Sequence, residues 1–200
     1  MQSYSKISAC LGYFVLFIFW GFQYLEAELK GSPHDFSKQA WNSRSSLCGP
    51  CHTTHHVMTQ PLWGRQLSRA VYTMYPEGIL LGKIDNQPSF SSLLCLSCHD
   101  GTQPLESKGA GRTYINAAAR RGPDLRNHHP VSVVYVAGSK LVSQSMPSGL
   151  GRSIAKDLLK NGKVECVSCH DVHSRNNNAR LLHRQKDLLC QICHIQVPGK

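Results

Sequence analysis

The longest apolar segment of the chain lies near its amino-terminal end. Residues Leu11–Phe22 are almost entirely apolar, with one positive charge before them at Lys6 and a small residue after them at Ala27. This order is typical of a secretory signal peptide. A retained membrane anchor is the alternative, but a spanning helix needs about 20 apolar residues, more than this run contains. We therefore expect a cleaved signal peptide over residues 1–27 and a single domain over residues 28–200.

Beyond residue 27 the apolar positions are scattered, and only short stretches follow a regular period. Residues 153–160 (SIAKDLLK) predict a short helix that the following Asn161-Gly162 would stop. Residues 131–136 (VSVVYV) predict a short β-strand. Residues 103–124 are rich in Gly, Ala and Arg and predict a loop, and residues 175–178 predict a turn. The pattern predicts mostly irregular coil with short α-helices and a minor β-strand component.

The motif Cys-x-x-Cys-His occurs four times, at residues 48–52, 95–99, 166–170 and 190–194, numbered here motifs 1 to 4. It is the covalent attachment site of c-type haem. The two thiols add to the haem vinyl groups, and the histidine becomes the proximal ligand of the iron. The expected attachment residues are Cys48, Cys51, Cys95, Cys98, Cys166, Cys169, Cys190 and Cys193. The expected proximal ligands are His52, His99, His170 and His194. The motifs thus predict four covalently attached haem c groups, each with an iron, and short helices around the motifs.

Zinc binding and thiol–disulfide chemistry are the alternative interpretations of Cys-x-x-Cys. Neither requires a histidine directly after the second cysteine, whereas all four pairs have one. Eight of the nine cysteines belong to the motifs, and the ninth, Cys10, lies in the predicted signal peptide. The mature domain would therefore keep no cysteine for a structural disulfide, and the haem interpretation is favoured.

Composition and charge agree with a haem-filled interior. Four of the six Phe residues lie in the predicted signal peptide, which leaves a thin apolar core. We expect the haems to supply the core and the chain to wrap around them, so that folding depends on them. The formal net charge of +10 falls to about +2 once roughly eight propionates of four haems are counted. The basic residues are scattered along the sequence rather than clustered, so no nucleic-acid partner is expected.

The sixth ligand of each iron decides its chemistry. Seven histidines lie outside the motifs, namely His34, His55, His56, His128, His129, His173 and His183. Met58, Met74 and Met146 are alternatives, but an isolated Met more often fills gaps in packing. Seven histidines suffice for four irons, so we expect four bis-His, low-spin haems without an open coordination position.

Two of these histidines share one spacing. His55 follows the proximal His52 by three residues, and His173 follows the proximal His170 by three. Residues three apart on a helical turn lie on the same side, whereas the two ligands of one iron approach it from opposite faces. His55 and His173 should therefore each serve an iron other than their neighbour's, which would bring haems into close pairs.

His129 and His34 are further candidates. Pro130 follows His129 at the head of the predicted strand and would hold its imidazole rigidly. His34 lies near the start of the mature domain, where a short polar terminus can reach its own chain or a neighbouring subunit. Asp35 or a backbone carbonyl could orient such a ring. We interpret His56, His128 and His183 as bystanders, each an alternative to a neighbouring ligand.

Several segments match a known family in order and spacing. They are residues 34–37 (HDFS), 48–55 (CGPCHTTH), 61–63 (PLW), 94–102 (LCLSCHDGT), 129–132 (HPVS) and 163–173 (KVECVSCHDVH). Through them the chain resembles the tetrahaem surface cytochromes of metal-respiring microbes that polymerise into extracellular electron-conducting filaments (the OmcE-like type), within the broader doubled Cys-x-x-Cys-His class. The resemblance implies bis-His ligation by His34, His55, His129 and His173, little secondary structure, and haems in a continuous chain through stacked subunits. Residues 112–126 match no part of that pattern.

Three functions are compatible with these features. The first is electron conduction by a secreted, extracellular or cell-surface filament, a head-to-tail homopolymer in which His34 could ligate a haem of the next subunit. Redox-partner cytochromes or extracellular acceptors would exchange electrons with it, and no stable membrane span would remain after cleavage. The second is a soluble periplasmic tetrahaem shuttle, since the resembled family has periplasmic members that do not polymerise. The third, a multihaem reductase of a small oxyanion, needs an open iron that the intact motifs and the histidine supply do not indicate. We therefore expect an electron-transfer protein rather than an enzyme.

Overall fold

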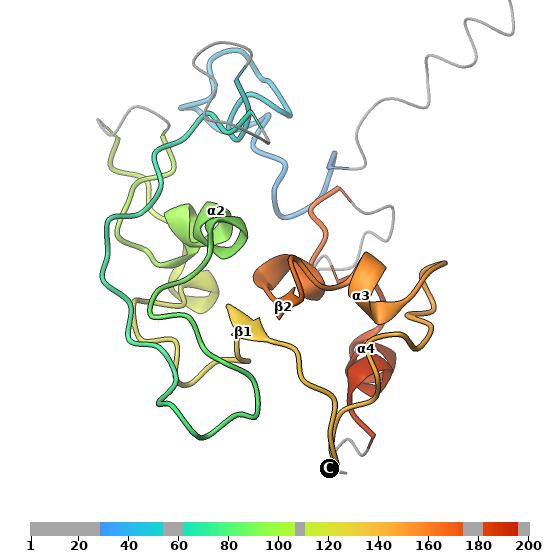
Figure 1. The fold of residues 1–200 in the computed structure, drawn as a ribbon. Coiled ribbons are helices and arrows are strands. Elements are labelled where there is room, and N and C mark those ends of the chain that lie inside the picture. Colours follow the sequence, from blue (N-terminus) through green and yellow to red (C-terminus); the bar gives the residue numbers. More distant parts are fainter. Residues whose placement is uncertain (1–28, 54–61, 107–110, 174–181, 196–200) are drawn as a thin grey trace, which may run out of the picture.

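A computed structural model describes residues 29–53, 62–106, 111–173 and 182–195. The predicted signal peptide, the candidate ligand His55 and the predicted turn at 175–178 lie outside the described residues. The elements in chain order are α2 (Phe90–His99), η2 (Ala117–Ala119), β1 (Val133–Val134), α3 (Ile154–Asp157), β2 (Lys163–Val164), η3 (Cys166–Ser168) and α4 (Lys186–Cys193), where η denotes a 3-10 helix. Turns and irregular coil make up most of what is described, in agreement with the fold class that the sequence predicts. Figure 1 shows the small sheet between α2 on one side and α3 and α4 on the other.

No helix within the described ranges is long and apolar enough to cross a bilayer.

Helix α2 forms over ten residues that include no Gly, Pro or β-branched side chain. It begins after Ser89, which is in an extended conformation. It ends where Gly101 adopts a left-handed conformation (φ 75°) and donates its N–H to the Cys98 carbonyl at 3.1 Å. Leu96, on the buried side of the helix, is 2% exposed. The helix therefore anchors itself in the interior and carries the residues of motif 2 in its last turns.

The predicted strand at 131–136 is reduced to β1. Ser132 adopts a left-handed conformation (φ 58°), which interrupts the extended run before Val133. β1 pairs with β2 in antiparallel register, Val133 opposite Val164 and Val134 opposite Lys163. Strand pairing therefore places the residues just before motif 3 beside the middle of the chain.

A third extended segment lies along the other edge of β1. Val134 donates its N–H to the Lys83 carbonyl at 2.9 Å, and Asp85 donates to the Ser132 carbonyl at 3.0 Å. Gly82 lies so close to the Val134 carbonyl that a Cβ there would be 1.7 Å from its oxygen. A residue larger than Gly at this position would push the segment away from β1.

The predicted helix at 153–160 is observed only as α3, over four residues. Asn161 and Gly162 do not stop a helix but form the turn of a hairpin, with φ angles of 53° and 74°. Lys160 and Lys163 exchange two backbone hydrogen bonds of 3.0 Å across this turn. Two consecutive residues with positive φ are characteristic of the tight hairpin turn that Asn-Gly favours. The turn directs the chain into β2 and then into motif 3.

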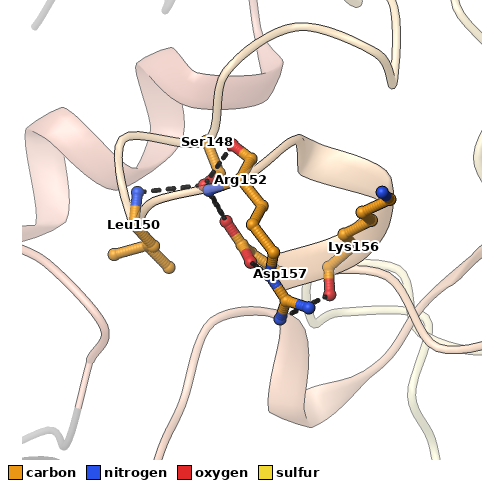
Figure 2. A network of polar contacts seen from close by, with 5 residues as sticks. All are labelled: Ser148, Leu150, Arg152, Lys156 and Asp157. Carbon is orange, nitrogen blue, oxygen red and sulfur yellow. Dashed lines mark hydrogen bonds and ion pairs between the residues drawn. The ribbon is translucent and has the colours of Figure 1, made fainter.

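The loop before α3 is held by the carboxylate of Asp157, as Figure 2 shows. This carboxylate accepts hydrogen bonds from Ser148 Oγ, from the Arg152 N–H at 2.8 Å and from Arg152 Nε at 2.7 Å. Ser148 Oγ in turn accepts the N–H of Leu150 at 2.9 Å. These contacts are local and exposed to solvent on the Arg152 side, so we interpret them as structural support for α3.

The apolar interior consists of two small clusters. The first is formed by Tyr72, Leu96 and Leu125 around α2, and the second by Tyr135, Ile154 and Leu159 near α3. Among the described residues, eleven hydrophobic side chains are buried and eleven large ones are exposed. A polypeptide that leaves as many large apolar groups in water as it buries has a weak core of its own. Four porphyrins packed against such groups would change this balance.

Candidate functional site

The four motifs lie on different local structures. Motif 2 ends α2, motif 3 starts in η3, and motif 4 lies at the end of α4. Motif 1 has no helix, contrary to the expectation of a short helix at each motif. It forms a single turn in which the N–H groups of Cys51 and His52 both donate to the Cys48 carbonyl, at 3.1 and 2.9 Å. Gly49 and Pro50 lie inside this motif, and both residue types disfavour a continuous helix.

Successive motifs lie side by side. The Cys95 thiol is hydrogen-bonded to Cys166, which lowers the pKa of Cys166 to about 7 and holds the pKa of Cys95 well above its usual value. Burial raises the pKa of Cys51 to about 11, and the nearby Cys98 adds to this shift. Burial also raises the pKa of Cys169 to about 11, with the thiols of motif 4 adding to it. The attachment points therefore follow one another through the molecule in chain order.

Three motif histidines each face a histidine from outside the motifs. The pairs are His34 with His99 at 5.9 Å, His52 with His173 at 6.1 Å, and His129 with His194 at 6.3 Å between ring centroids. Two imidazoles on opposite sides of one metal, with metal–nitrogen distances of about 2.0 Å, have centroids about 6 Å apart. All three pairs thus have the separation of two axial ligands, and these residues fit a haem iron.

The pairing separates neighbours in the sequence. His173 lies beside His52 of motif 1 rather than beside His170, three residues before it. The three-residue spacing predicts that His173 serves an iron other than that of motif 3, and this stays a prediction. The equivalent prediction for His55 falls outside the described residues.

In two of these rings, a hydrogen bond from Nδ1 leaves Nε2 free to bind a metal. His99 Nδ1 lies 3.0 Å from the Ala119 carbonyl, and His129 Nδ1 lies 3.1 Å from the Pro130 carbonyl. A carbonyl oxygen only accepts, so each Nδ1 carries the proton and each Nε2 keeps its lone pair. Metal-bound histidines are commonly oriented in this way.

The two described bystander histidines use the opposite nitrogen. His128 Nε2 lies 3.0 Å from the Arg121 carbonyl, and His183 Nε2 lies 3.0 Å from the Val167 carbonyl. In both rings the outer nitrogen therefore carries the proton. This contrast is consistent with a role as bystanders.

The segment around His34 is built from turns. Asp35 accepts the N–H of Gly31 at 2.8 Å and both the N–H and the hydroxyl of Ser37 at 3.0 and 2.5 Å. Asp35 therefore fixes the backbone on both sides of His34, whereas the sequence suggested that it orients a ring. Burial, with smaller contributions from the nearby His99 and His170, lowers the pKa of His34 to about 4. The ring is thus held neutral, as a metal ligand must be.

Four buried nitrogens have no hydrogen-bond partner among the described residues. They are His34 Nδ1, Trp41 Nε1, Trp63 Nε1 and Arg65 Nε. The Trp63 ring lies edge-on to His52, with centroids 6.0 Å apart. Buried donors without acceptors are rare in folded proteins and need an explanation. Haem propionates would supply acceptors here, and the sequence contains no motif that marks these donors.

Within the described ranges, which contain all four motifs, no three His, Cys, Asp or Glu side chains gather closely enough to hold a metal ion by themselves.

Comparison with protein families places part of the chain in a known motif family. Residues 158–198, which include motifs 3 and 4, match the doubled CXXCH motif family. No curated protein matches the chain. The family match supports a multihaem c-type cytochrome, with covalently bound haem c and a role in electron transfer.

Proposed function

We propose that the chain carries electrons along four closely spaced bis-His haems, one at each motif. The observation that carries this proposal is the set of three histidine pairs, each joining a motif histidine to one from outside the motifs at about 6 Å. The adjacency of successive motif cysteines supports close spacing of the four attachment points.

The ligand set follows from these pairs. His173 would complete motif 1, His34 motif 2 and His129 motif 4. His55 would then provide the sixth ligand of motif 3. It follows the proximal His52 by three residues, as His173 follows the proximal His170. The segment after each of motifs 1 and 3 would thereby supply the sixth ligand of the other motif's iron. Each such bond would hold the two attachment points together.

Bound haem supplies a reversible one-electron couple at each iron. The chain would hold both axial imidazoles. It keeps His34 neutral by burial and fixes His99 and His129 through backbone carbonyls. Two protein ligands per iron would leave no coordination position for a substrate, which favours electron transfer over a multihaem reductase.

The proposal extends to a secreted head-to-tail filament at or beyond the cell surface, with a periplasmic shuttle as the alternative. In the described fold His34 lies beside His99 of its own chain. Its segment is built from local turns, so the same segment of a neighbouring subunit could take the same place by exchange. Such an exchange would leave the ligand pair intact while linking subunits.

Haem content and spin state test the electron-transfer proposal. We expect intact mass and a pyridine haemochrome assay to give four haems per chain, and the oxidised protein to be entirely low-spin. A mass that lacks a haem in matured protein would contradict the motif interpretation. A high-spin signal from one haem per chain would instead favour the multihaem reductase.

Two matched histidine variants test the ligand set. His173→Ala should turn one haem high-spin while all four remain attached, and His183→Ala should leave the spectrum unchanged. A structure of the first variant should place the change at motif 1. A change at motif 3 would overturn the proposed exchange of ligands.

Electron microscopy of the native protein tests assembly. Filaments that disappear in His34→Ala while four haems are kept would support the exchange of the terminal segment. Single subunits in the native protein would favour the shuttle.

A further inference from the structure

Residues 112–126 contain an excess of positive charge that the proposed ligand set does not use. The charged residues of this segment are Arg112, Arg120, Arg121, Asp124 and Arg126. Arg126 forms an ion pair with Asp124 at 2.7 Å. At the start of the segment, Glu106 accepts the N–H of Thr113 at 3.2 Å and so lies beside the backbone of Arg112. Arg120 and Arg121 are both exposed, and neither has a carboxylate partner among the described residues.

Backbone carbonyls hold both of these guanidinium groups in place. Arg120 donates from Nε to the Ile115 carbonyl at 3.0 Å. Arg121 donates to the carbonyls of Ala118 and Ala119 at 2.8 and 3.4 Å. A guanidinium has five N–H donors, so most donors of each group stay available on the exposed side. Two neighbouring cations are thus oriented in advance for carboxylates from outside the chain, which pair well with guanidinium groups.

The backbone that carries the two arginines is itself anchored. The side chain of Asn116 caps η2 by accepting the N–H of Ala119 at 3.0 Å. After η2, Thr73 donates its N–H to the Pro123 carbonyl at 2.9 Å, and Leu125 donates to the Thr73 carbonyl at 3.0 Å. Leu125 is 3% exposed and belongs to the apolar cluster around α2. The charged pair therefore lies on a fixed support and loses little conformational freedom when a partner binds.

The same segment contacts the proximal ligand of motif 2. The Ala119 carbonyl lies 3.0 Å from His99 Nδ1, and Arg121 donates its backbone N–H to the His99 carbonyl at 2.6 Å. The stem of Arg120 covers Gly101, where an added Cβ would be 2.9 Å from Arg120 Cδ. In Figure 1 the segment lies against the end of α2. The two exposed cations are therefore beside motif 2.

We propose that Arg120 and Arg121 form the docking site of an acidic electron-transfer protein that exchanges electrons with the haem of motif 2. This inference rests on the proposed function. Two fixed cations attract the carboxylates of such a partner and raise the rate of encounter. One electron leaves the reduced cofactor of the partner, which is oxidised, and one ferric haem iron becomes ferrous. No bond is formed or broken, and no proton moves.

The composition of the segment favours a protein over other polyanions. Tyr114 is 45% exposed, and Tyr and Arg are enriched where proteins contact one another. An anionic membrane attracts clusters of about four to eight basic residues or a basic amphipathic helix, whereas the helix here is the three-residue η2. Electron-transfer complexes bury small interfaces, which a short segment can supply. Two cations and one aromatic ring therefore suit brief, repeated contact with a small carboxylate patch.

Mixing the oxidised holoprotein with reduced flavodoxin tests this inference. Flavodoxin is a small acidic protein that gives up one electron at a time, and it serves here as the probe. We expect the second-order rate constant of haem reduction at low salt to fall about tenfold in the double variant Arg120→Gln, Arg121→Gln. The difference should vanish in about 1 M salt, where the Debye length is about 3 Å. The charge-conserving variant Arg120→Lys, Arg121→Lys should keep most of the native rate.

Two controls separate docking from net charge and from changes at the haem. The double variant Lys156→Gln, Lys160→Gln removes two exposed cations at α3, across the sheet from α2, and should change the rate less than about twofold. Photoreduced lumiflavin, a neutral one-electron donor, should reduce all variants at the native rate. Equal slowing by both double variants would overturn the docking site in favour of a general charge effect. Slowing with lumiflavin would overturn it in favour of a role at the haem itself, such as binding a propionate.

NMR locates the contact. Oxidised flavodoxin and the oxidised holoprotein exchange no electrons, so signal changes on mixing report binding alone. The amide signals of residues 112–126 and the haem signals of motif 2 should shift, whereas the amide signals of α3 should stay in place. Shifts confined to another haem, or equal shifts in Arg120→Gln, Arg121→Gln, would overturn the docking site and leave the proposed function standing. Absence of haems from the native protein would overturn both.

Discussion

Motifs 1 and 2 hold the same five-residue attachment site in opposite kinds of surroundings. Motif 2 closes a ten-residue helix whose Leu96 is buried against Tyr72 and Leu125. Motif 1 is a single turn between coil segments, and among the described residues none of its own five belongs to either apolar cluster. Around motif 1 the interior groups are instead aromatic rings and donors without acceptors, such as Trp63 Nε1.

The difference shows that the attachment motif does not by itself dictate local structure. Motif 2 lies on a helix that packs against its own chain, whereas buried donors near motif 1 would find acceptors on a haem. We infer that the region of motif 1 folds on its haem, whereas α2 helps to form the site that receives one.

Removing the attachment cysteines should break this comparison most strongly. We expect the double variant Cys48→Ala, Cys51→Ala to lose one haem and to lose amide protection over residues 29–53, by on the order of 100-fold or more. The matching variant Cys95→Ala, Cys98→Ala should also lose one haem but keep most protection within α2. Intact mass and hydrogen exchange measure both. Equal loss of protection in the two regions would show that α2 depends on its haem as much as motif 1 does.

Truncating a leucine in each region gives the next largest contrast. Leu96→Ala should lower the free energy of unfolding by about 2–5 kcal/mol, because it opens a cavity in the cluster around α2. Leu62, 46% exposed near motif 1, is the control. Leu62→Ala should change stability by less than about 0.5 kcal/mol. Denaturant unfolding of the holoproteins makes the comparison, and similar losses would contradict it.

Serine hydroxyls allow a finer comparison. Ser92→Ala removes a donor from the buried Glu165 carboxylate and should cost about 1–3 kcal/mol. Ser46 Oγ accepts the exposed N–H of Gly49 at 2.8 Å near motif 1. Ser46→Ala should cost less than Ser92→Ala, since water can replace the lost acceptor. A larger loss of stability from Ser46→Ala than from Ser92→Ala would show that the polar contacts near motif 1 stabilise the fold more than those of Glu165.

The smallest expected effect belongs to Trp63→Phe, which keeps an aromatic ring beside His52 and deletes the unpaired N–H. We expect four haems, stability within about 1 kcal/mol of the native protein, and a changed propionate vibration of one haem in resonance Raman spectra. An unchanged spectrum would show that this N–H does not serve a propionate.

The sequence predicts the fold class, mostly coil with short helices and a minor strand component, better than it predicts the individual elements. The spacing of His170 and His173 predicts that the two serve different irons, and in the structure His173 lies beside His52. Gly49 and Pro50 could have indicated that motif 1 lacks a helix. The helix stop predicted at Asn161-Gly162 is instead the turn of a local hairpin between Lys160 and Lys163, which the Asn-Gly pair itself favours.

The buried charges could not be predicted from sequence. Glu165 is buried only because Ser92 and Ser132, from two distant segments, meet around it. Nothing in the sequence around Arg65 distinguishes it from an exposed basic residue. Its guanidinium is buried because it donates to the carbonyls of Pro104 and Leu105. Such sites arise from tertiary contacts that leave no periodic or local signal.

The contact between His52 and His173 also constrains the order of events while the protein is made. Motif 1 is synthesised before motif 3, so a haem joined early at motif 1 would wait for its native partner. Closing so long a loop is slow, whereas histidines nearby in the chain can be reached quickly. The nascent chain should therefore pass through species in which a local histidine holds the sixth position and must be released before His173 can bind. Maturation of the protein would then be limited by release of a non-native ligand and its replacement by His173, rather than by haem attachment.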